Sequence, residues 1–306
     1  MKIAIAGIGG VGGYFGGLLA RHYFNSSTEI IFIARGENEK IIRDHGLKMQ
    51  TMSGDFTVHP KMVTSDCSQV GKVDLLICCM KGYDLEEAVL HCRPCINHET
   101  VILPLLNGVD ATERIEKIFP SNEVWRGCVY LVSRRAEPGL IKETGNIRKL
   151  FFGSVSGRED KLQQAEKILK DAGIDATWSR NIIETTWEKY LFISPIATIT
   201  SYLDKTISEI FSDVNAEKLL RQLLDEIKTV ADASHIFLLE NIQKENIDRM
   251  RSLPPATTSS MHSDFRKGGR TELDSLTGYV IDLASRLNVE VPAFKMMYEK
   301  LRMRSR

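Results

Sequence analysis

The pattern of apolar and polar positions along the chain changes its period near residue 180. Before that point, short apolar runs of strand length alternate with stretches of helical period, which is typical of a doubly wound α/β sheet. After it, apolar positions recur with the spacing of one helix face. The pattern therefore predicts an α/β fold with two domains, a doubly wound sheet over residues 1–180 and an all-helical domain over residues 181–306.

The individual elements follow from the same pattern, and Pro254-Pro255 marks a turn between two of the helices. Strands are expected over residues 2–6, 29–34, 73–79, 100–105, 124–132, 140–143, 149–155 and 176–178. Helices are expected over residues 11–23, 84–92, 158–172, 182–203, 214–234, 240–250, 259–267 and 273–287.

A glycine-rich turn follows the first predicted strand. The sequence Gly7-Ile8-Gly9-Gly10-Val11-Gly12 has GxGxxG spacing at a strand-to-helix junction, where the pyrophosphate of a dinucleotide binds. Gly7 permits the tight turn, Gly9 lets the backbone approach the phosphates, and Gly12 lets helix and strand pack closely. An export signal is an alternative, but a strand, a turn and a helix account for every glycine. A glycine-rich turn that binds no ligand is a second alternative, and only the rest of the sequence can decide against it.

The residue at the end of the second predicted strand bears on the choice between NAD and NADP. An acid there would bond the ribose 2′-hydroxyl of NAD, whereas an arginine accommodates the 2′-phosphate of NADP. This chain has Arg35 there, and its first acid, Glu37, falls in a predicted loop. NADP is therefore favoured, and the alternative is that Arg35 is an ordinary solvated loop residue.

Composition limits the kinds of partner. The chain has 306 residues with 43% hydrophobic content, enough for two domains, and its 40 basic and 40 acidic side chains cancel. No global charge favours nucleic acid or an anionic membrane, so neither is expected as a partner. Apolar helix faces in the second half would permit a homodimer.

The cysteines indicate a reducing compartment. All six fall at or before Cys128, which is a poor disulfide framework for a secreted protein, so a cytoplasmic location is expected. Cys92 and Cys95 have CxxC spacing without a second pair, and packing in an apolar site is the favoured interpretation over a redox role. His262 is predicted to lie on the surface, and nothing indicates a metal site.

Polar residues follow two of the predicted strands, and a lysine stands on a predicted helix. Lys81 and Asn107 each come directly after an apolar run, where ligands of doubly wound folds bind, although ordinary turns also place polar residues there. Lys189 shares a helix face with Thr185 and Ile193. Burial there would disfavour its charged form and favour proton donation, and the alternative is a lysine whose amine reaches water.

A further candidate segment precedes the last predicted helix. Gly268-Gly269 suits a helix C-cap, and Thr271 with Asp274 resembles a capping box, which puts Glu272 in the first helical turn. Glu272 is either an acid that complements the helix dipole or a carboxylate held beside a cleft. Ser260 is likewise either a helix-start hydroxyl or a ligand donor.

Together these motifs resemble the ketopantoate reductase (2-dehydropantoate 2-reductase) family. The resemblance rests on the N-terminal GxGxxG, Lys81 in CCMKGYD, Asn107 in LLNGV, Trp187-Glu188-Lys189 and SSMHSDFRKGGRTELD, and it covers essentially the whole chain. It implies a Rossmann domain and a helical domain with the active site in the cleft between them. The implied reaction is NADPH-dependent reduction of 2-dehydropantoate to pantoate, on the route to pantothenate and coenzyme A.

The resemblance also implies cofactor-binding residues. Gly7 to Gly12 would cradle the pyrophosphate, and Arg35 would meet the 2′-phosphate. Lys81 and Asn107 would contact the cofactor and help to order the site, and Glu272 would bond near the nicotinamide ribose.

The same resemblance implies the residues of catalysis. Lys189 matches the catalytic lysine, which protonates the carbonyl oxygen as hydride arrives and stabilises the developing alkoxide. Ser260 matches a substrate-binding serine, and Glu272 matches an active-site carboxylate that also bonds near the substrate.

This chain departs from the family pattern at two positions. Better-known members carry asparagines four and eight residues after the catalytic lysine, where this chain has Ile193 and Ala197. Their absence leaves the keto acid open, because such donors discriminate substrate hydroxyls. A kink at Pro195 would reorient polar neighbours, which are the candidates to replace the amides. These candidate neighbours are Ser194, Thr198 and Thr200.

The sequence thus predicts an NADP-dependent oxidoreductase that reduces a small 2-keto acid, with Lys189 as the general acid. One alternative is a reductase of a different keto acid in the same family, or a dehydrogenase whose substrate is a larger 2-hydroxy or 3-hydroxy acid. The other is a non-enzymatic sensor that binds NADP, which would leave Lys189 and Glu272 without a shared purpose.

Overall fold

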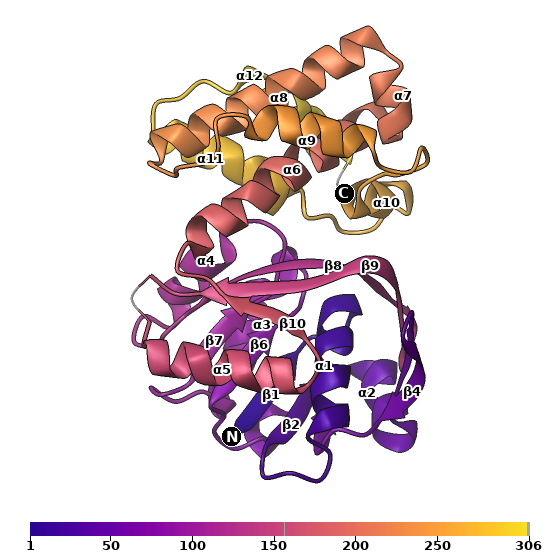
Figure 1. Ribbon diagram of the computed structural model, residues 1–306, viewed down its shortest axis with the longest axis vertical. Helices are drawn as coiled ribbons and strands as arrows, with labels where there is room; N and C mark the ends of the chain where they lie inside the picture. The colour runs from indigo at the N-terminus through magenta and orange to yellow at the C-terminus, as the bar shows by residue number, and fades with distance from the viewer. Residues whose placement is uncertain (156, 305–306) are drawn as a thin grey trace. The chain divides into compact units, whose positions relative to one another are not determined.

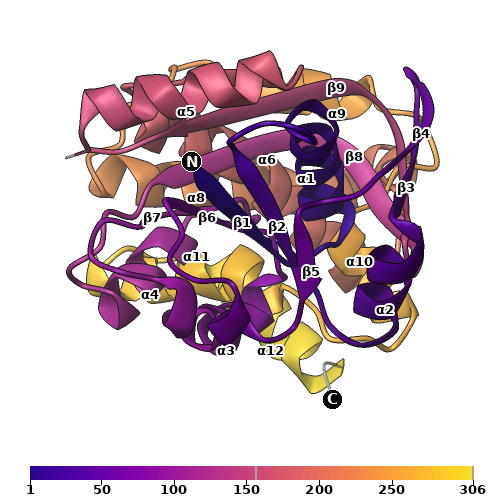
Figure 2. The same cartoon turned by 90° about the horizontal axis from the view of Figure 1, so that it is seen from below.

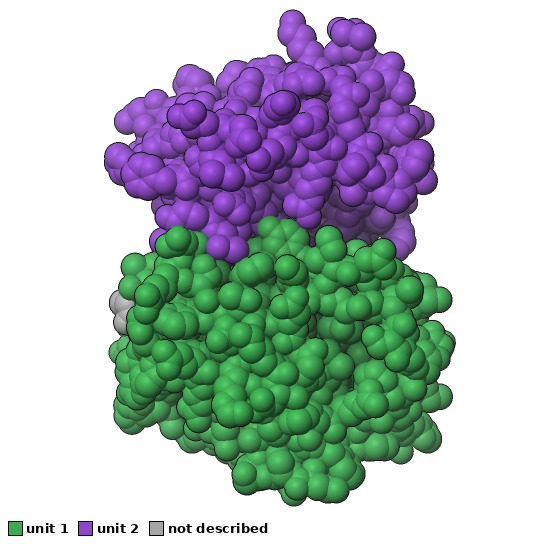
Figure 3. Space-filling model, in the orientation of Figure 1, with its two compact units in different colours: residues 1–106, 111–182 green, residues 107–110, 183–306 purple. Residues whose placement is uncertain are grey.

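The computed structural model describes residues 1–155 and 157–304, which fold into two compact units (Figure 1; Figure 3). One unit comprises residues 1–106 and 111–182, and the other comprises residues 107–110 and 183–306. The segment 107–110 lies in the first half of the sequence but packs with the helical half of the chain.

A five-stranded parallel sheet forms the centre of the first unit (Figure 2). Two crossovers run in opposite directions from β1, so the carboxyl ends of β1 and β6 form the switch point where doubly wound sheets bind ligands. The predicted parallel sheet is therefore confirmed. Its strands, in spatial order, are β5 (Met62–Thr64), β2 (Glu29–Ile33), β1 (Lys2–Ala6), β6 (Leu75–Cys78) and β7 (Val101–Pro104).

Helices cover both faces of this sheet. Successive side chains of a strand point to opposite faces, so Ile5 packs in one core with α1 (Gly10–His22). Its neighbour Ala6 packs in a second core with α3 (Leu85–His91) and α4 (Ala111–Ile118). The doubly wound arrangement is thus confirmed.

A second sheet packs against α1 on the side away from the first. Its order is β10-β9-β3-β4, β8 pairs with β9, and helix α5 packs on β10. These elements are β3 (Leu47–Thr51), β4 (Gly54–Val58), β8 (Arg126–Glu137), β9 (Leu140–Gly153), α5 (Glu159–Asp171) and β10 (Asp175–Trp178).

Parts of the first unit differ from the sequence prediction. The two strands expected at 140–143 and 149–155 are one strand, β9, which pairs with β8 on both sides of a register shift at the largely polar, exposed residues between Glu143 and Arg148. Strands β3, β4 and β5 and helix α2 (Gly36–His45) were not expected. Glu37 accordingly lies in the first turn of α2, and its placement in a loop was wrong.

The second unit is helical, as predicted, and its long helix α6 (Ile182–Leu203) continues through Pro195. The helix expected at 273–287 is a π-helical segment, Asp274–Gly278, followed by α11. No helix in the described part of the chain is both long and apolar enough to span a membrane. The other helices are α7 (Ile207–Phe211), α8 (Val214–Ala233), α9 (Ile242–Arg251), α10 (Ser260–Arg266), α11 (Tyr279–Arg286) and α12 (Pro292–Arg304).

Candidate active site

The glycine turn lies where the sequence predicts it, between β1 and α1. Gly7 has φ +93°, a conformation that favours glycine, and a Cβ there would lie 3.0 Å from the carbonyl carbon of Cys79 at the end of β6. A Cβ on Gly12 would lie 2.2 Å from the Gly7 carbonyl oxygen. A Cβ on Gly9 would meet nothing within 4 Å. Gly7 and Gly12 thus shape the turn, and Gly9 keeps its outer side open.

The remaining glycines of α1 let two sheets approach one helix. A Cβ on Gly13 would lie 2.4 Å from Ile141 of β9, whereas a Cβ on Gly16 would lie 2.9 Å from Phe32 of β2. Close packing of α1 against two sheets therefore explains glycines that the turn between β1 and α1 does not require. The second of these sheets was not predicted from the hydrophobic pattern.

Asn38 holds the glycine turn from α2. It is 5% exposed, its Nδ2 donates to the Ile8 carbonyl at 3.1 Å, and its Oδ1 accepts from the Gly139 amide at 2.8 Å. A buried amide bonded on both sides fixes the backbone it contacts. Sequence reasoning missed Asn38, and its only signal was an amide on the apolar side of an unassigned helix.

Arg35 lies at the end of β2 and precedes α2. Its side chain is 54% exposed, and its Nη1 lies 3.3 Å from Glu87 Oε1. An exposed pair of this kind is weak, so the guanidinium is available to an anion at modest cost. Arg35 therefore presents an exposed cation at the carboxyl end of β2.

Lys81 begins the short helix Gly82–Asp84 after β6. The next residue is held firmly, because Arg114 Nη2 donates to the Gly82 carbonyl at 2.6 Å. Arg114 also donates to both oxygens of Glu86, at 2.6 and 2.7 Å. That hydrogen bonding lowers the pKa of Glu86. An ion pair between α3 and α4 thus positions the turn that carries Lys81.

Lys189 and Asn107 meet within the second unit. Lys189 Nζ donates to Asn107 Oδ1 at 3.0 Å, and both side chains are partly buried. Asn107 is part of the short segment 107–110, where Gly108 has φ +93°. The amide therefore orients the ammonium group on α6, which sequence spacing alone did not reveal.

A stripe of hydroxyl groups on α6 faces the π-helical segment. Tyr190 Oη donates to the Ser275 carbonyl at 2.9 Å, and Ser194 Oγ donates to the Leu276 carbonyl at 2.6 Å. Thr198 Oγ1 lies 2.8 Å from Thr277 Oγ1. These side chains are buried, and the irregular segment offers the carbonyls that Tyr190 and Ser194 bind and the hydroxyl that Thr198 contacts.

The suggested replacements for the family's amides are therefore not supported. Ser194 and Thr198 bond to the π-helical segment, and Thr200 Oγ1 donates to the Ile196 carbonyl at 2.6 Å. All three are 0% exposed, so their hydroxyls are engaged inside the unit. Ile193, on the same face of α6 as Lys189, is partly exposed, and that face is apolar beyond the lysine.

The acid and the serine of the last motif differ in exposure. Glu272 is 3% exposed and precedes the helical residue Leu273, so its predicted place in the first helical turn was wrong. Ser260 is the first residue of α10 and is exposed. His262 was predicted at the surface but is 1% exposed, because two polar partners satisfy its ring nitrogens.

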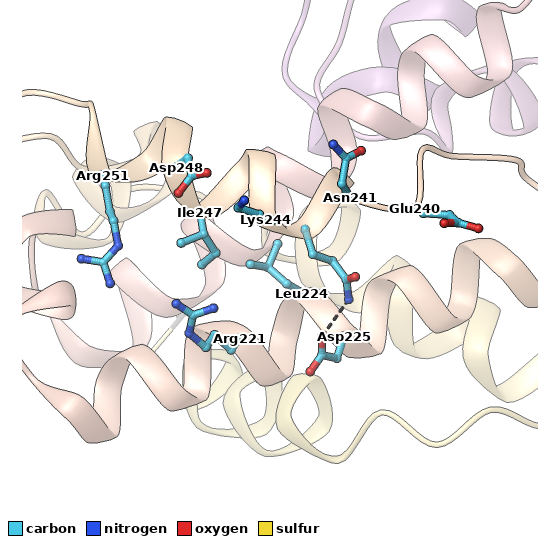
Figure 4. A pocket seen from close by; sticks show the side chains of 10 residues that line it. Arg221, Leu224, Asp225, Glu240, Asn241, Lys244, Ile247, Asp248 and Arg251 are labelled. Atoms are coloured by element: carbon cyan, nitrogen blue, oxygen red, sulfur yellow. Dashed lines mark hydrogen bonds between the residues drawn. The ribbon is translucent and has the colours of Figure 1, made fainter.

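The cysteines and a pocket in the helical unit lie apart from these residues. Cys92 and Cys95 are buried, and Cys92 Sγ lies 3.9 Å from Cys67 Sγ, which indicates packing of free thiols. No cluster of possible metal ligands occurs in residues 1–155 and 157–304. A pocket of about 480 Å³ between α8 and α9 contains none of the predicted site residues. In it, Gln243 Nε2 donates to Asp225 Oδ1 at 2.7 Å (Figure 4).

A doubly wound sheet with a glycine turn at its switch point, followed by a helical unit with an oriented lysine, defines a class: oxidoreductases of pyridine nucleotides. The family described as "Ketopantoate reductase PanE/ApbA" matches residues 3–157, and its C-terminal part, "Ketopantoate reductase PanE/ApbA C terminal", matches residues 181–305. The chain therefore belongs to the ketopantoate reductase family.

Three relatives illustrate the range of this similarity. The chain is 35% identical in sequence to 2-dehydropantoate 2-reductase from Porphyromonas gingivalis W83, whose crystal structure is known. The two structures match with a TM-score of 0.86, over 98% of this chain and 99% of that one. It is 28% identical to the uncharacterized oxidoreductase YkpB of Bacillus subtilis, over 99% of this chain and 98% of the relative. It is 25% identical to a D-mandelate dehydrogenase solved with NADH and anilino(oxo)acetate, with a TM-score of 0.87 and coverage of 100% and 98%.

Proposed function

We propose that this protein is an NADPH-dependent reductase of a 2-keto acid, in which Lys189 is the general acid. The observation that carries the proposal is the hydrogen bond of 3.0 Å from Lys189 Nζ to Asn107 Oδ1. The neutral Asn107 amide holds a partly buried ammonium group in a defined direction, which is what a proton donor requires.

The first unit has the features that a dinucleotide requires. The open outer side of Gly9 leaves room for the pyrophosphate, and the exposed guanidinium of Arg35 suits a 2′-phosphate. Lys81 follows β6 at the same edge of the sheet. These residues fit NADP, which supplies hydride when bound, and we assign its binding to the domain over residues 1–180.

The second unit supplies the proton and the contacts to the acid, in a domain over residues 181–306. Lys189 protonates the carbonyl oxygen of the keto acid, and its charge stabilises the alkoxide that forms during reduction. Ser260 donates its exposed hydroxyl to the substrate. Glu272 is a buried carboxylate that we assign to hydrogen bonds with the nicotinamide ribose and the substrate.

The first candidate substrate is 2-dehydropantoate, which is reduced to pantoate for pantothenate and coenzyme A synthesis. Membership of the family and the 35% identical reductase support it. Such a role would place the enzyme in the cytoplasm, as a monomer or a homodimer.

A second candidate is a keto acid with an apolar or aromatic side chain. Ile193 and Ala197 make the face beyond Lys189 apolar, and the nearby hydroxyls are bonded elsewhere. The similarity to a D-mandelate dehydrogenase favours the same substrate class. An apolar face offers no hydrogen-bond partner for the hydroxyl of 2-dehydropantoate, so it does not favour this substrate.

Absorbance at 340 nm tests these proposals directly, because reduction of a keto acid consumes NADPH. The protein is assayed with 2-dehydropantoate, phenylglyoxylate and branched aliphatic keto acids, each with NADPH and with NADH. Lys189→Ala should lower kcat by about 10²- to 10⁴-fold, as expected for loss of a general acid. Unchanged turnover in that variant would reject the role of Lys189, and tight NADPH binding without turnover of any acid would favour a sensor.

A further inference from the structure

A buried histidine lies beside the residue that we assign to the substrate. His262 Nε2 lies 2.6 Å from Asp204 Oδ1, and His262 Nδ1 is hydrogen-bonded to Thr258 Oγ1. Asp204 directly follows α6, and Thr258 stands two residues before Ser260. The three side chains therefore form a hydrogen-bonded chain from the end of α6 to the start of α10.

The direction of these hydrogen bonds follows from the groups involved. A carboxylate only accepts, so Nε2 of His262 carries the hydrogen that is donated to Asp204. In the neutral ring, Nδ1 then accepts, and the hydroxyl of Thr258 donates to it. The pKa of Asp204 is lowered, first by this hydrogen bond and also by Arg266, whose Nε lies 3.2 Å from Asp204 Oδ1.

The backbone at Asp204 is also specialised. Asp204 has φ +54°, which is uncommon for a residue other than glycine and costs conformational energy. The bend lets its carboxylate reach His262 and Arg266 together. The amide of Lys205 closes the helix end by donating to the Thr200 carbonyl at 3.3 Å.

Two further contacts hold the same segment. The Ile207 amide donates to the Thr257 carbonyl at 3.0 Å. Ser259 Oγ accepts from the His262 amide at 3.0 Å and lies 3.0 Å from Thr200 Oγ1. Each of residues 257, 258 and 259 is therefore held by at least one hydrogen bond. The residue that follows them, Ser260, is exposed.

We propose that Asp204, His262 and Thr258 are positioning residues that set the location of the Ser260 hydroxyl for the keto acid. This inference rests on the proposed function, which gives Ser260 its role. His262 reaches neither substrate nor cofactor in this proposal and acts only through the backbone of residues 258–260. Loss of the chain should weaken substrate binding and leave the binding of NADPH unchanged.

A pair of substitutions at Thr258 tests the proposal in the full-length protein. Thr258→Val keeps the shape of the side chain and removes the hydroxyl, whereas Thr258→Ser keeps the hydroxyl. Thr258→Val should raise the KM for the best keto acid by about three- to tenfold, the effect of losing one hydrogen bond, with kcat and the Kd for NADPH within about twofold. Thr258→Ser should restore the KM. An unchanged KM in Thr258→Val overturns the proposal. An equal rise of KM in Thr258→Val and Thr258→Ser overturns it as well.

A double-mutant cycle with Ser260→Ala shows whether the effect passes through Ser260. In the Ser260→Ala background, Thr258→Val should raise KM no further, because coupled residues are not additive. A full additional increase contradicts the proposal. If Ser260→Ala alone leaves KM unchanged, the assigned role of Ser260 fails instead, which distinguishes the two claims.

Hydrogen exchange gives a readout that does not depend on turnover. The amides of His262 and Ser263, which donate to the hydroxyl and the carbonyl oxygen of Ser259, should exchange faster in Thr258→Val and in Asp204→Asn than in Thr258→Ser. Asp204→Asn is a mild change, because asparagine tolerates positive φ and retains an acceptor. Equal exchange in all three variants would contradict the positioning role even if no keto acid were turned over.

Discussion

Lys189 Nζ donates a hydrogen bond of 3.0 Å to Asn107 Oδ1, although 82 positions separate the two residues in the sequence. The segment 107–110 leaves the strand β7 and packs with the helical unit, which brings the amide to α6. A neutral acceptor orients the ammonium group without neutralising its charge. The pair is therefore suited to hold a proton donor in a fixed direction.

Removal of this acceptor should slow the reductase. Asn107→Leu removes this acceptor of the ammonium group, and we expect kcat to fall by about ten- to a hundredfold, since hydrogen bonds to charged groups contribute about 1.5–3 kcal/mol. Asn107→Asp retains an acceptor and should lose less. Steady-state kinetics with NADPH measures both variants, and equal activity of Asn107→Leu and the wild type would contradict the role of the pair.

Two glycines of the turn should respond differently to a methyl group. Gly12→Ala places a Cβ 2.2 Å from the Gly7 carbonyl oxygen and should lower stability by about 1–3 kcal/mol, as overpacking does. Gly9→Ala meets no atom within 4 Å and should melt like the wild type, yet bind NADPH more weakly. Thermal melts and NADPH titration separate the effects, and normal NADPH binding by Gly9→Ala would argue against a phosphate beside that residue.

Arg35 should control the choice of cofactor. Arg35→Glu replaces the cation with an acid, so the Kd for NADPH should rise by at least about tenfold, the loss of one charge-assisted hydrogen bond, while the Kd for NADH stays within about twofold. Glu87→Gln is the matched control, because it frees Arg35 from its exposed ion pair at 3.3 Å and should leave NADPH binding equal or tighter. Parallel changes for both cofactors in Arg35→Glu would mean that Arg35 does not meet the 2′-phosphate.

The ion pair of Glu86 and Arg114 should make stability depend on pH in the acid range. Hydrogen bonding to Arg114 lowers the pKa of Glu86, so its contribution to stability is complete above the unfolded-state pKa near 4.5 and is lost as pH falls through the folded-state value. Glu86→Gln should therefore be less stable than the wild type at pH 7, and the two should converge in acid. Urea unfolding across this range measures the difference, and a constant gap down to the lowest pH would contradict the assignment.

Ile193 should influence the side chain that the substrate carries. Ile193→Asn adds an amide on the face of α6 that holds Lys189, and it should raise kcat/KM for 2-dehydropantoate relative to phenylglyoxylate by about tenfold or more. Ile183→Asn makes the same change on another face of α6 and should leave the ratio unaltered. An unchanged ratio in Ile193→Asn would show that this face does not contact the substrate side chain.

Long elements of strong period were predictable, and elements held by pairing were not. The helix α8 was expected at residues 214–234 and spans Val214–Ala233, because a long amphipathic pattern needs no partner to be recognised. The middle of β9 is largely polar and exposed, and β9 is recognisable as one strand only from its backbone pairing with β8 on both sides of a register shift between Glu143 and Arg148. A ladder leaves little trace in the hydrophobic pattern of either strand.

The histidine and the hydroxyl groups were misjudged for a related reason. His262 looked like a surface residue because a polar ring is buried only where partners satisfy both nitrogens, and one partner, Asp204, lies 58 positions away. Ser194 and Thr198 looked available because their partners, the Leu276 carbonyl and the Thr277 hydroxyl, belong to the π-helical segment, which no sequence rule predicted. Asn38 was missed in the same way, since its partners are backbone groups of other elements.

The sequence by itself determined the parallel sheet, the glycine turn at the end of its first strand and the helical second half, because these follow from local periodicity and from backbone space that only glycine leaves. Only the tertiary structure decided that α1 lies between two sheets and that Asn107 orients Lys189. It also decided which hydroxyls of α6 are already bonded. Those features depend on contacts between residues far apart in the chain, and such contacts have no period along it.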